Sequence, residues 1–71
     1  MYLEFTEYKT GHLMSVLKSN ILQVDKDDDG LAVICYREPI HFRSNKNKKF
    51  YGFYGFYAKE TYEEIMSKLN K

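Results

Sequence analysis

Residues 21–36 read ILQVDKDDDGLAVICY, and this stretch is the clearest structural signal in the chain. It contains two runs rich in aliphatic and β-branched residues, 21–24 and 31–36, which are typical of strands. Between them, residues 25–30 hold four aspartates and a closing glycine, the residue types that favour turns. The stretch therefore predicts an antiparallel β-hairpin, and the segments on either side are expected to extend it into a sheet.

The segment before this hairpin alternates between apolar and polar residues over 2–8. Leu3 and Phe5 fall on one face of a strand and Glu4 on the other, which predicts a half-buried strand. Residues 12–19 then carry apolar side chains at helical spacing, namely Leu13, Val16 and Leu17. This spacing predicts a short helix, and because the segment is short a strand is the alternative.

The chain after the hairpin predicts two more strands and a helix. Residues 40–43, which follow the single proline, predict a short strand, residues 44–49 a polar loop, and residues 50–57 a strong aromatic strand. Thr61 and Glu64 have the spacing of a capping box, which marks the start of an amphipathic helix. The apolar face of that helix consists of Tyr62, Ile65, Met66 and Leu69.

Together these elements predict a single α+β domain over residues 1–71. Its centre is a small antiparallel β-sheet of about 4–5 strands. A short helix in the N-terminal half and the C-terminal amphipathic helix are expected to pack on one face of this sheet. A length of 71 residues leaves no room for a second domain.

Composition limits the classes of function. The single cysteine, Cys35, cannot form an internal disulfide, which favours the cytoplasm. The longest apolar run, Leu31–Tyr36, is far shorter than the ~20 residues that span a bilayer, so no membrane partner is expected. The formal net charge of +1 is unevenly distributed, with a net charge of −3 over residues 1–36 and +5 over residues 37–59. This balance argues against a basic protein that coats DNA and against an acidic mimic of DNA.

The aromatic residues are unevenly distributed, because six of the twelve lie in residues 50–57, which read FYGFYGFY. As one strand, this segment would place Tyr54 and Phe56 against the helices. A sheet covered by helices on one side buries only one of its faces, so the rings on the other face are expected to be exposed or to meet a partner. Those rings are Tyr51, Phe53 and Tyr57.

Residues 49–56 resemble the aromatic octapeptide of RNA-recognition motifs at Lys49, Tyr51, Gly52, Phe53 and Phe56. The resemblance implies that bases stack on Tyr51 and Phe53 while Lys49 pairs with a phosphate. It is local, because a phenylalanine at position 50 replaces a glycine of the motif and the family's fourth strand has no counterpart after the last helix. A second local resemblance, to the small sheet and helix that precede many phage integrases, implies a DNA partner.

The sequence thus predicts a non-enzymatic module that binds nucleic acid. Stacking is assigned to the aromatic residues Tyr51, Phe53 and Tyr57. Phosphate contacts are assigned to the adjacent basic loop, through Arg43, Lys46, Lys48 and Lys49. The alternative is a small regulatory or inhibitory protein, of phage or prophage type, that binds a host protein through the same aromatic face. The same face could also form a homodimer.

The acidic turn resembles the first half of the calcium loop of EF-hand proteins, because Asp25, Asp27 and Asp29 alternate before Gly30. Tyr36 stands where that loop would end in a bidentate glutamate. The favoured interpretation is therefore a hydrophilic hairpin turn, with the three aspartates as a weak calcium candidate.

No catalytic residues and no cofactor are expected. Cys35 lies in an apolar β-rich run, where a buried and inert thiol is the usual outcome. The spacing of Cys35 and His41 does not indicate a nucleophile and its base. The spacing of the two histidines and the cysteine does not indicate a zinc site either. A chain this short also leaves little room for a substrate pocket.

Overall fold

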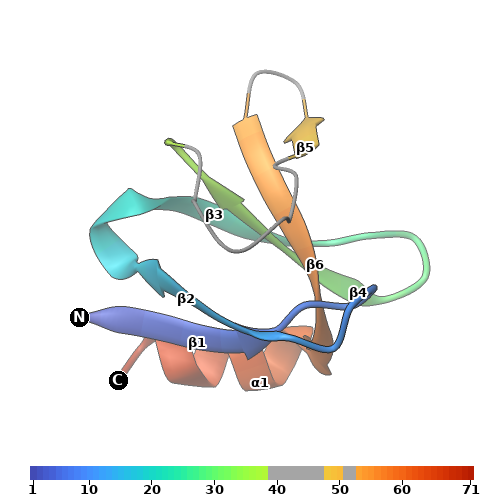
Figure 1. Cartoon of the computed structure of the whole chain (residues 1–71). Helices are drawn as coiled ribbons and strands as arrows, with labels where there is room; N and C mark the ends of the chain where they lie inside the picture. The colour runs from blue at the N-terminus through green and yellow to red at the C-terminus, as the bar shows by residue number, and fades with distance from the viewer. Residues whose placement is uncertain (39–47, 51–52) are drawn as a thin grey trace.

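The structure, a computed structural model, describes residues 1–38, 48–50 and 53–71 (Figure 1). These residues form two antiparallel sheets and one α-helix, α1 (Tyr62–Leu69). The first sheet pairs β1 (Tyr2–Thr6) with β2 (Leu13–Leu17). The second has the order β3-β4-β6-β5, from β3 (Ile21–Lys26), β4 (Leu31–Tyr36), β6 (Phe53–Thr61) and β5 (Lys48–Phe50). The α+β class and the antiparallel strands are confirmed, but the strands divide into two sheets instead of one.

The predicted helix over residues 12–19 is wrong, and the strand alternative is right. Leu13–Leu17 forms β2, and only Lys18–Asn20 turns, as the short 3₁₀-helix η1. In β2 the buried Met14 and Val16 alternate with exposed neighbours. The same apolar residues satisfy both a helical and a strand period over so short a segment. Pairing with β1 decides in favour of the strand, because Leu3 lies opposite Val16 and the two buried faces coincide.

The hairpin predicted from residues 21–36 is confirmed as β3 and β4. Asp27 closes the turn, because its Oδ1 accepts hydrogen bonds from the backbone N–H of Asp29 at 3.0 Å and of Leu31 at 2.8 Å. Gly30 has a φ of +86°, a left-handed conformation that costs a residue without a Cβ little energy. Aspartate and glycine therefore shape this turn through specific backbone geometry.

The predicted continuous strand over residues 50–57 is wrong. Phe50, in β5, pairs with Phe53, in β6, so the chain reverses direction between them. The sequence has Gly52 at this point, and a glycine inside a β-rich run often marks an interruption of the strand. β6 then continues to Thr61, beyond the predicted end. The predicted strand over residues 40–43 and the loop residues 44–47 lie outside the described part of the chain.

The C-terminal helix begins where the capping box predicts. Thr61 Oγ1 accepts from the backbone N–H of Glu64 at 3.1 Å, and Glu64 Oε1 accepts from the backbone N–H of Thr61 at 3.0 Å. Ile65 is fully buried on the inner face of α1. Lys18 then holds the end of the helix, because its Nζ donates to the carbonyl of Lys68 at 3.1 Å. As Figure 1 shows, α1 lies beneath β1.

One core fills the space between the two sheets and α1. Within it, the buried Tyr36 and Phe56 stack with ring centroids 5.6 Å apart, and the partly buried Tyr54 stacks on Tyr36 at 6.0 Å. The expectation that Tyr54 and Phe56 face inward is therefore confirmed. The buried cluster comprises Leu3, Phe5, Met14, Val16, Ala32, Ile34, Tyr36, Phe56, Ala58 and Ile65.

The two sheets meet at the end of β1. Glu7 forms an isolated antiparallel bridge with Ala58 of β6, and the backbone N–H of Tyr8 donates to the carbonyl of Tyr57 at 2.9 Å. The inner faces of both sheets thus close over the core, while the outer face of β1 and β2 is left to solvent. Within the described residues no helix has the length and apolar character needed to cross a membrane.

Candidate functional site

The residues predicted to bind nucleic acid are only partly described. Arg43, Lys46 and Tyr51 lie outside the described residues. The backbones of Lys48 and Lys49 belong to β5, paired with Gly55 and Tyr54, so these lysines start a strand where the sequence predicts the end of a loop. Phe53 begins β6. Tyr57 lies in the middle of β6 and is half-buried. The predicted aromatic and basic surface therefore stays a prediction, because Lys48, Lys49 and Phe53 are placed here by their backbone alone.

The acidic residues 25–30 lie at the hairpin turn between β3 and β4. Asp27 uses its carboxylate to bind the turn's own backbone, as described above. Asp25 Oδ2 accepts a hydrogen bond from Gln23 Nε2 at 2.8 Å and a longer one from Cys35 Sγ at 3.9 Å. Among the described residues, no three side chains of His, Cys, Asp or Glu are grouped so that they could hold a metal ion. Local hydrogen bonds thus engage the carboxylates of Asp25 and Asp27.

The thiol of Cys35 is unsuited to nucleophilic chemistry. The side chain is buried, and burial raises the pKa of the thiol, with the negative charge of Asp25 adding to the effect. The thiolate, which is the reactive form, is therefore disfavoured at neutral pH.

Two carboxylates bind backbone at the junction of the sheets. Glu7 is buried and accepts hydrogen bonds from the backbone N–H groups of Lys9 and Thr10, each at 3.0 Å, and from the Thr10 hydroxyl at 2.7 Å. Glu60 accepts from the backbone N–H of Thr6 at 2.9 Å and 3.0 Å, and from its hydroxyl at 2.9 Å. Burial raises the pKa of both carboxyls, but the hydrogen bonds outweigh it and lower the pKa of each. Both are charged structural groups rather than proton donors or acceptors for catalysis.

The outer face of β1 and β2 exposes large apolar side chains. The exposed fractions are 62% for Tyr2, 60% for Leu13 and 45% for Leu17, and Met1 adjoins them with 85%. Tyr2 and Leu17 are directly opposite one another in the sheet. Isolated apolar residues are normal on a protein surface. Here four lie on one side of a small sheet, with the exposed pair of Glu4 and Ser15 between Leu13 and the other three. We name this surface, made by Met1, Tyr2, Leu13 and Leu17, the apolar face.

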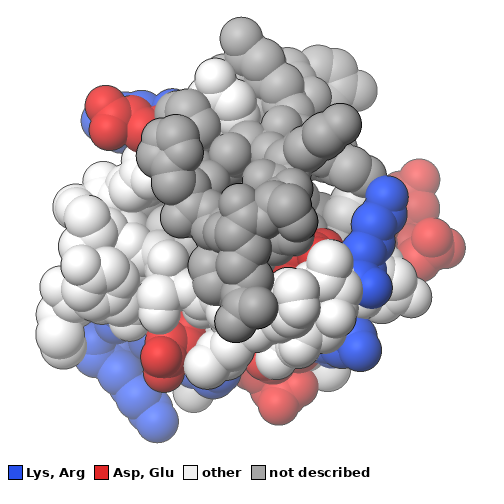
Figure 2. All heavy atoms as spheres, viewed as in Figure 1, with Lys and Arg blue, Asp and Glu red and all other residues white. Residues whose placement is uncertain are grey.

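Figure 2 shows how the charged side chains are distributed on this view of the molecule. The left side of the molecule, where Figure 1 places the N-terminus and η1, is mostly uncharged in Figure 2, with charged side chains at its upper and lower ends.

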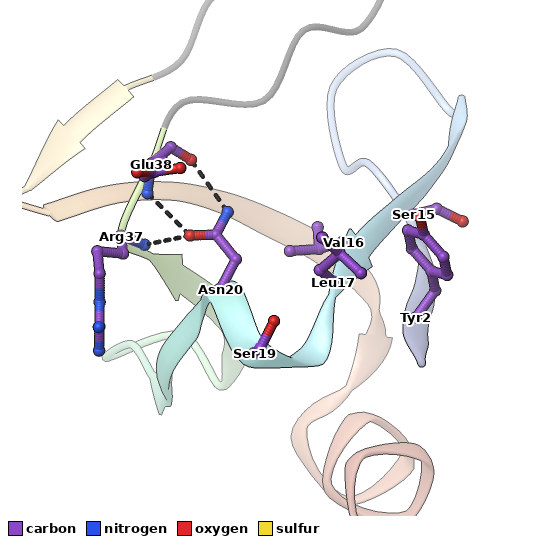
Figure 3. A pocket seen from close by; sticks show the side chains of 8 residues that line it. All are labelled: Tyr2, Ser15, Val16, Leu17, Ser19, Asn20, Arg37 and Glu38. Atoms are coloured by element: carbon purple, nitrogen blue, oxygen red, sulfur yellow. Dashed lines mark hydrogen bonds between the residues drawn. The ribbon is translucent and has the colours of Figure 1, made fainter.

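A cleft of about 420 Å³ adjoins the apolar face (Figure 3). One wall is formed by β1 and β2, and the other by η1 and the residues that follow β4. The lining residues are Tyr2, Ser15, Val16, Leu17, Ser19, Asn20, Arg37 and Glu38. The cleft thus combines an apolar wall with a polar one.

Asn20 fixes the polar wall. Its Oδ1 accepts hydrogen bonds from the backbone N–H of Arg37 at 3.2 Å and of Glu38 at 2.9 Å, and its Nδ2 donates to the carbonyl of Glu38 at 3.1 Å. A carboxamide can do this because it carries both donors and an acceptor. The residues that follow β4 are therefore tied to η1, and together they form one connected wall of the cleft (Figure 3).

The apolar face is the feature that sequence reasoning missed. The helical interpretation of residues 12–19 placed Leu13 and Leu17 on the buried side of a helix, together with Val16. Read as a strand, the same residues alternate, and the pattern would place Leu13 and Leu17 opposite Val16. In comparisons with known proteins, no family model, no curated protein and no solved structure matches this chain.

Proposed function

We propose that this chain is a non-enzymatic binding module whose partner is another protein, held on the apolar face and in the adjoining cleft. The observation that carries the proposal is the exposure of Tyr2, Leu13 and Leu17 on one side of a sheet whose other side is fully packed. Leaving these side chains in water forgoes the free energy of burying them, about 1.5–3 kcal/mol for a Leu-sized side chain. A partner surface recovers that energy. This agrees with the predicted class of small regulatory protein, but through a different surface.

The described residues hold nine Lys and Arg against ten Asp and Glu, so they supply no positive excess for phosphate groups. Nucleic-acid binding through Tyr51, Phe53 and Tyr57 stays a prediction. If the chain binds nucleic acid, it should be retained on heparin, and salt should weaken this retention. Replacing Lys46, Lys48 and Lys49 by glutamine should abolish the retention. Retention that survives this replacement contradicts nucleic-acid binding.

Site-specific photocrosslinking in cells of the organism that encodes the chain tests the proposal. A photoreactive phenylalanine analogue in place of Tyr2 should give one discrete heavier adduct on irradiation, because this exposed position lies on the apolar face, directly opposite Leu17. Adding Leu17→Asp should reduce the adduct at least about fivefold, since it places a charge opposite the crosslinker in an apolar contact. Mass spectrometry of the adduct identifies the bound protein.

The matched control carries the same photoreactive residue in place of Ser67, which is exposed on α1. We expect no adduct from this position. Equal labelling from both positions, or no adduct from position 2, contradicts the proposal. Unchanged circular dichroism of Leu17→Asp ensures that the loss of the adduct reports on binding, not on unfolding.

A further inference from the structure

The outer edge of β2 presents unpaired backbone groups. The bonds from Lys18 N–H to the Met1 carbonyl, at 2.9 Å, and from Glu7 N–H to the His12 carbonyl, at 2.8 Å, identify the hydrogen-bonded pairs of the β1–β2 ladder. In an antiparallel ladder such pairs alternate with non-hydrogen-bonded pairs. The N–H and C=O groups of Leu13, Ser15 and Leu17 therefore point away from β1. Within the described residues, no strand pairs with this edge.

This edge lacks the protection that exposed strands usually carry. Edge strands are commonly blocked by lysine, proline or a bulge, which prevent pairing with another chain. The neighbouring β3 has Asp25, Lys26 and a register shift, and β5 has Lys48 and Lys49. By contrast β2 reads LMSVL, with neither a charge nor a proline, and its pairing with β1 is regular.

The sequence of β2, LMSVL, is symmetric about Ser15 in the kind of residue, with leucine at both ends and the apolar Met14 and Val16 on either side of the serine. A two-fold axis through Ser15 would pair Leu13 with Leu17 of a second copy, Met14 with Val16, and Ser15 with itself. Every pair in this register joins residues of the same kind, and no charges meet. The register also fits the backbone, because the residue on the axis is one whose N–H and C=O point outward.

We propose that two copies of this chain associate by antiparallel pairing of β2 with β2, in the register centred on Ser15. Each copy offers the same groups to the other, which is the condition for a closed two-fold interface. Leu13, Ser15 and Leu17 of each copy then contribute one outward N–H and one outward C=O to the new ladder. The paired strands join the two small sheets into one with the order β1-β2-β2-β1.

The paired sheet also enlarges the apolar face. Leu13 of one copy lies beside Leu17 of the other on the outward side, once on each side of the axis. The cleft lined by Ser15 and Leu17 adjoins this edge. Self-association depends on backbone at the strand edge and partner binding on side chains of the sheet face. The two proposals can therefore fail separately.

Sedimentation equilibrium from ~10 µM to ~1 mM is the direct test. The chain should shift from monomer to dimer over this range, because a short strand pair gives a small interface. Ser15→Pro should weaken the dimer at least about tenfold, since it removes the donor on the axis from both copies. This N–H faces away from β1, so the β1–β2 ladder keeps all its bonds, and edge strands tolerate such a proline. The control Ser15→Thr retains the N–H and should still dimerise.

A crosslink tests the register. Ser15→Cys places the two introduced thiols next to each other across the axis, and a short bismaleimide should join them in high yield. The buried Cys35 should not react, and Ser67→Cys on α1 serves as the exposed control. A monomer at the highest concentration, a dimer unaffected by Ser15→Pro, or equal crosslinking at positions 15 and 67 would overturn the inference. A monomer that still gives the Tyr2 adduct with another protein would leave the proposed function standing.

Discussion

Phe5→Ala is expected to lower the free energy of unfolding by about 3–5 kcal/mol, the largest stability loss that we predict for a single substitution. Phe5 is fully buried between the two sheets, opposite Met14 in the β1–β2 pairing. Truncation removes its transfer free energy and leaves a cavity that a core this thin can fill only in part. A domain of this size has a total stability of about 4–10 kcal/mol, so the substitution should remove a large share of it and shift the unfolding midpoint to a much lower urea concentration.

Urea denaturation followed by circular dichroism measures this effect. The control is Leu13→Ala, on the exposed side of the same small sheet, which should change the stability by less than about 0.5 kcal/mol. Together the two variants test the alternation of buried and exposed residues in β1 and β2. A loss at Leu13 as large as the loss at Phe5 would show that the apolar face is covered in the free chain, and would contradict the proposed interface.

Local signals in the sequence predicted those parts of the fold that local geometry determines. The capping box at Thr61 and Glu64 satisfies two backbone donors within one helical turn, so it requires no knowledge of distant residues. The turn at Asp27 and Gly30 is equally self-contained, because one carboxylate and one left-handed glycine shape it. Both features were predicted with their residues.

The sequence-based predictions were wrong where the structure of a segment depends on pairing with another strand. Residues 13–17 fit a helix and a strand about equally, and only the pairing with β1 selects the strand. The run of aromatic residues from 50 to 57 could form one long strand or two short paired ones, and Phe50 pairs with Phe53. The periodicity of a segment does not reveal its structure in such cases, because the structure depends on the strand with which the segment pairs.

The candidate site was missed for the same reason. Which groups of β2 point outward follows from the register of β2 against β1, set by bonds such as that from Lys18 to Met1. Without the register, neither the exposed side of Leu13 and Leu17 nor the free edge at Ser15 can be identified. The aromatic run drew attention because of its composition, whereas the apolar face becomes visible only through pairing.

Replacing both Glu7 and Glu60 by glutamine is expected to remove about 2–5 kcal/mol of stability at pH 7. Each carboxylate accepts three hydrogen bonds from backbone and hydroxyl donors at the junction of the sheets. Glutamine keeps one acceptor oxygen but turns an N–H₂ group toward the remaining donors, which then lose their partner. The two sites are close, because Glu60 binds the residue before Glu7, so their effects need not add.

The pH dependence gives this prediction its sharpest test. The folded-state pKa of each carboxyl lies below its ordinary value of 4.5. The stabilisation is therefore fully present above that value and is lost as the pH falls through the lower, folded-state pKa. Thermal unfolding from pH 7 to pH 2 should show a large gap between wild type and double variant near neutrality, and this gap should close progressively below about pH 4.5. Asp28→Asn, in the exposed turn, should follow the wild-type curve closely. A gap that stays constant down to pH 2 would mean that the two glutamates stabilise the junction through packing, because a contribution that depends on their charge must vanish once both are protonated in the folded state.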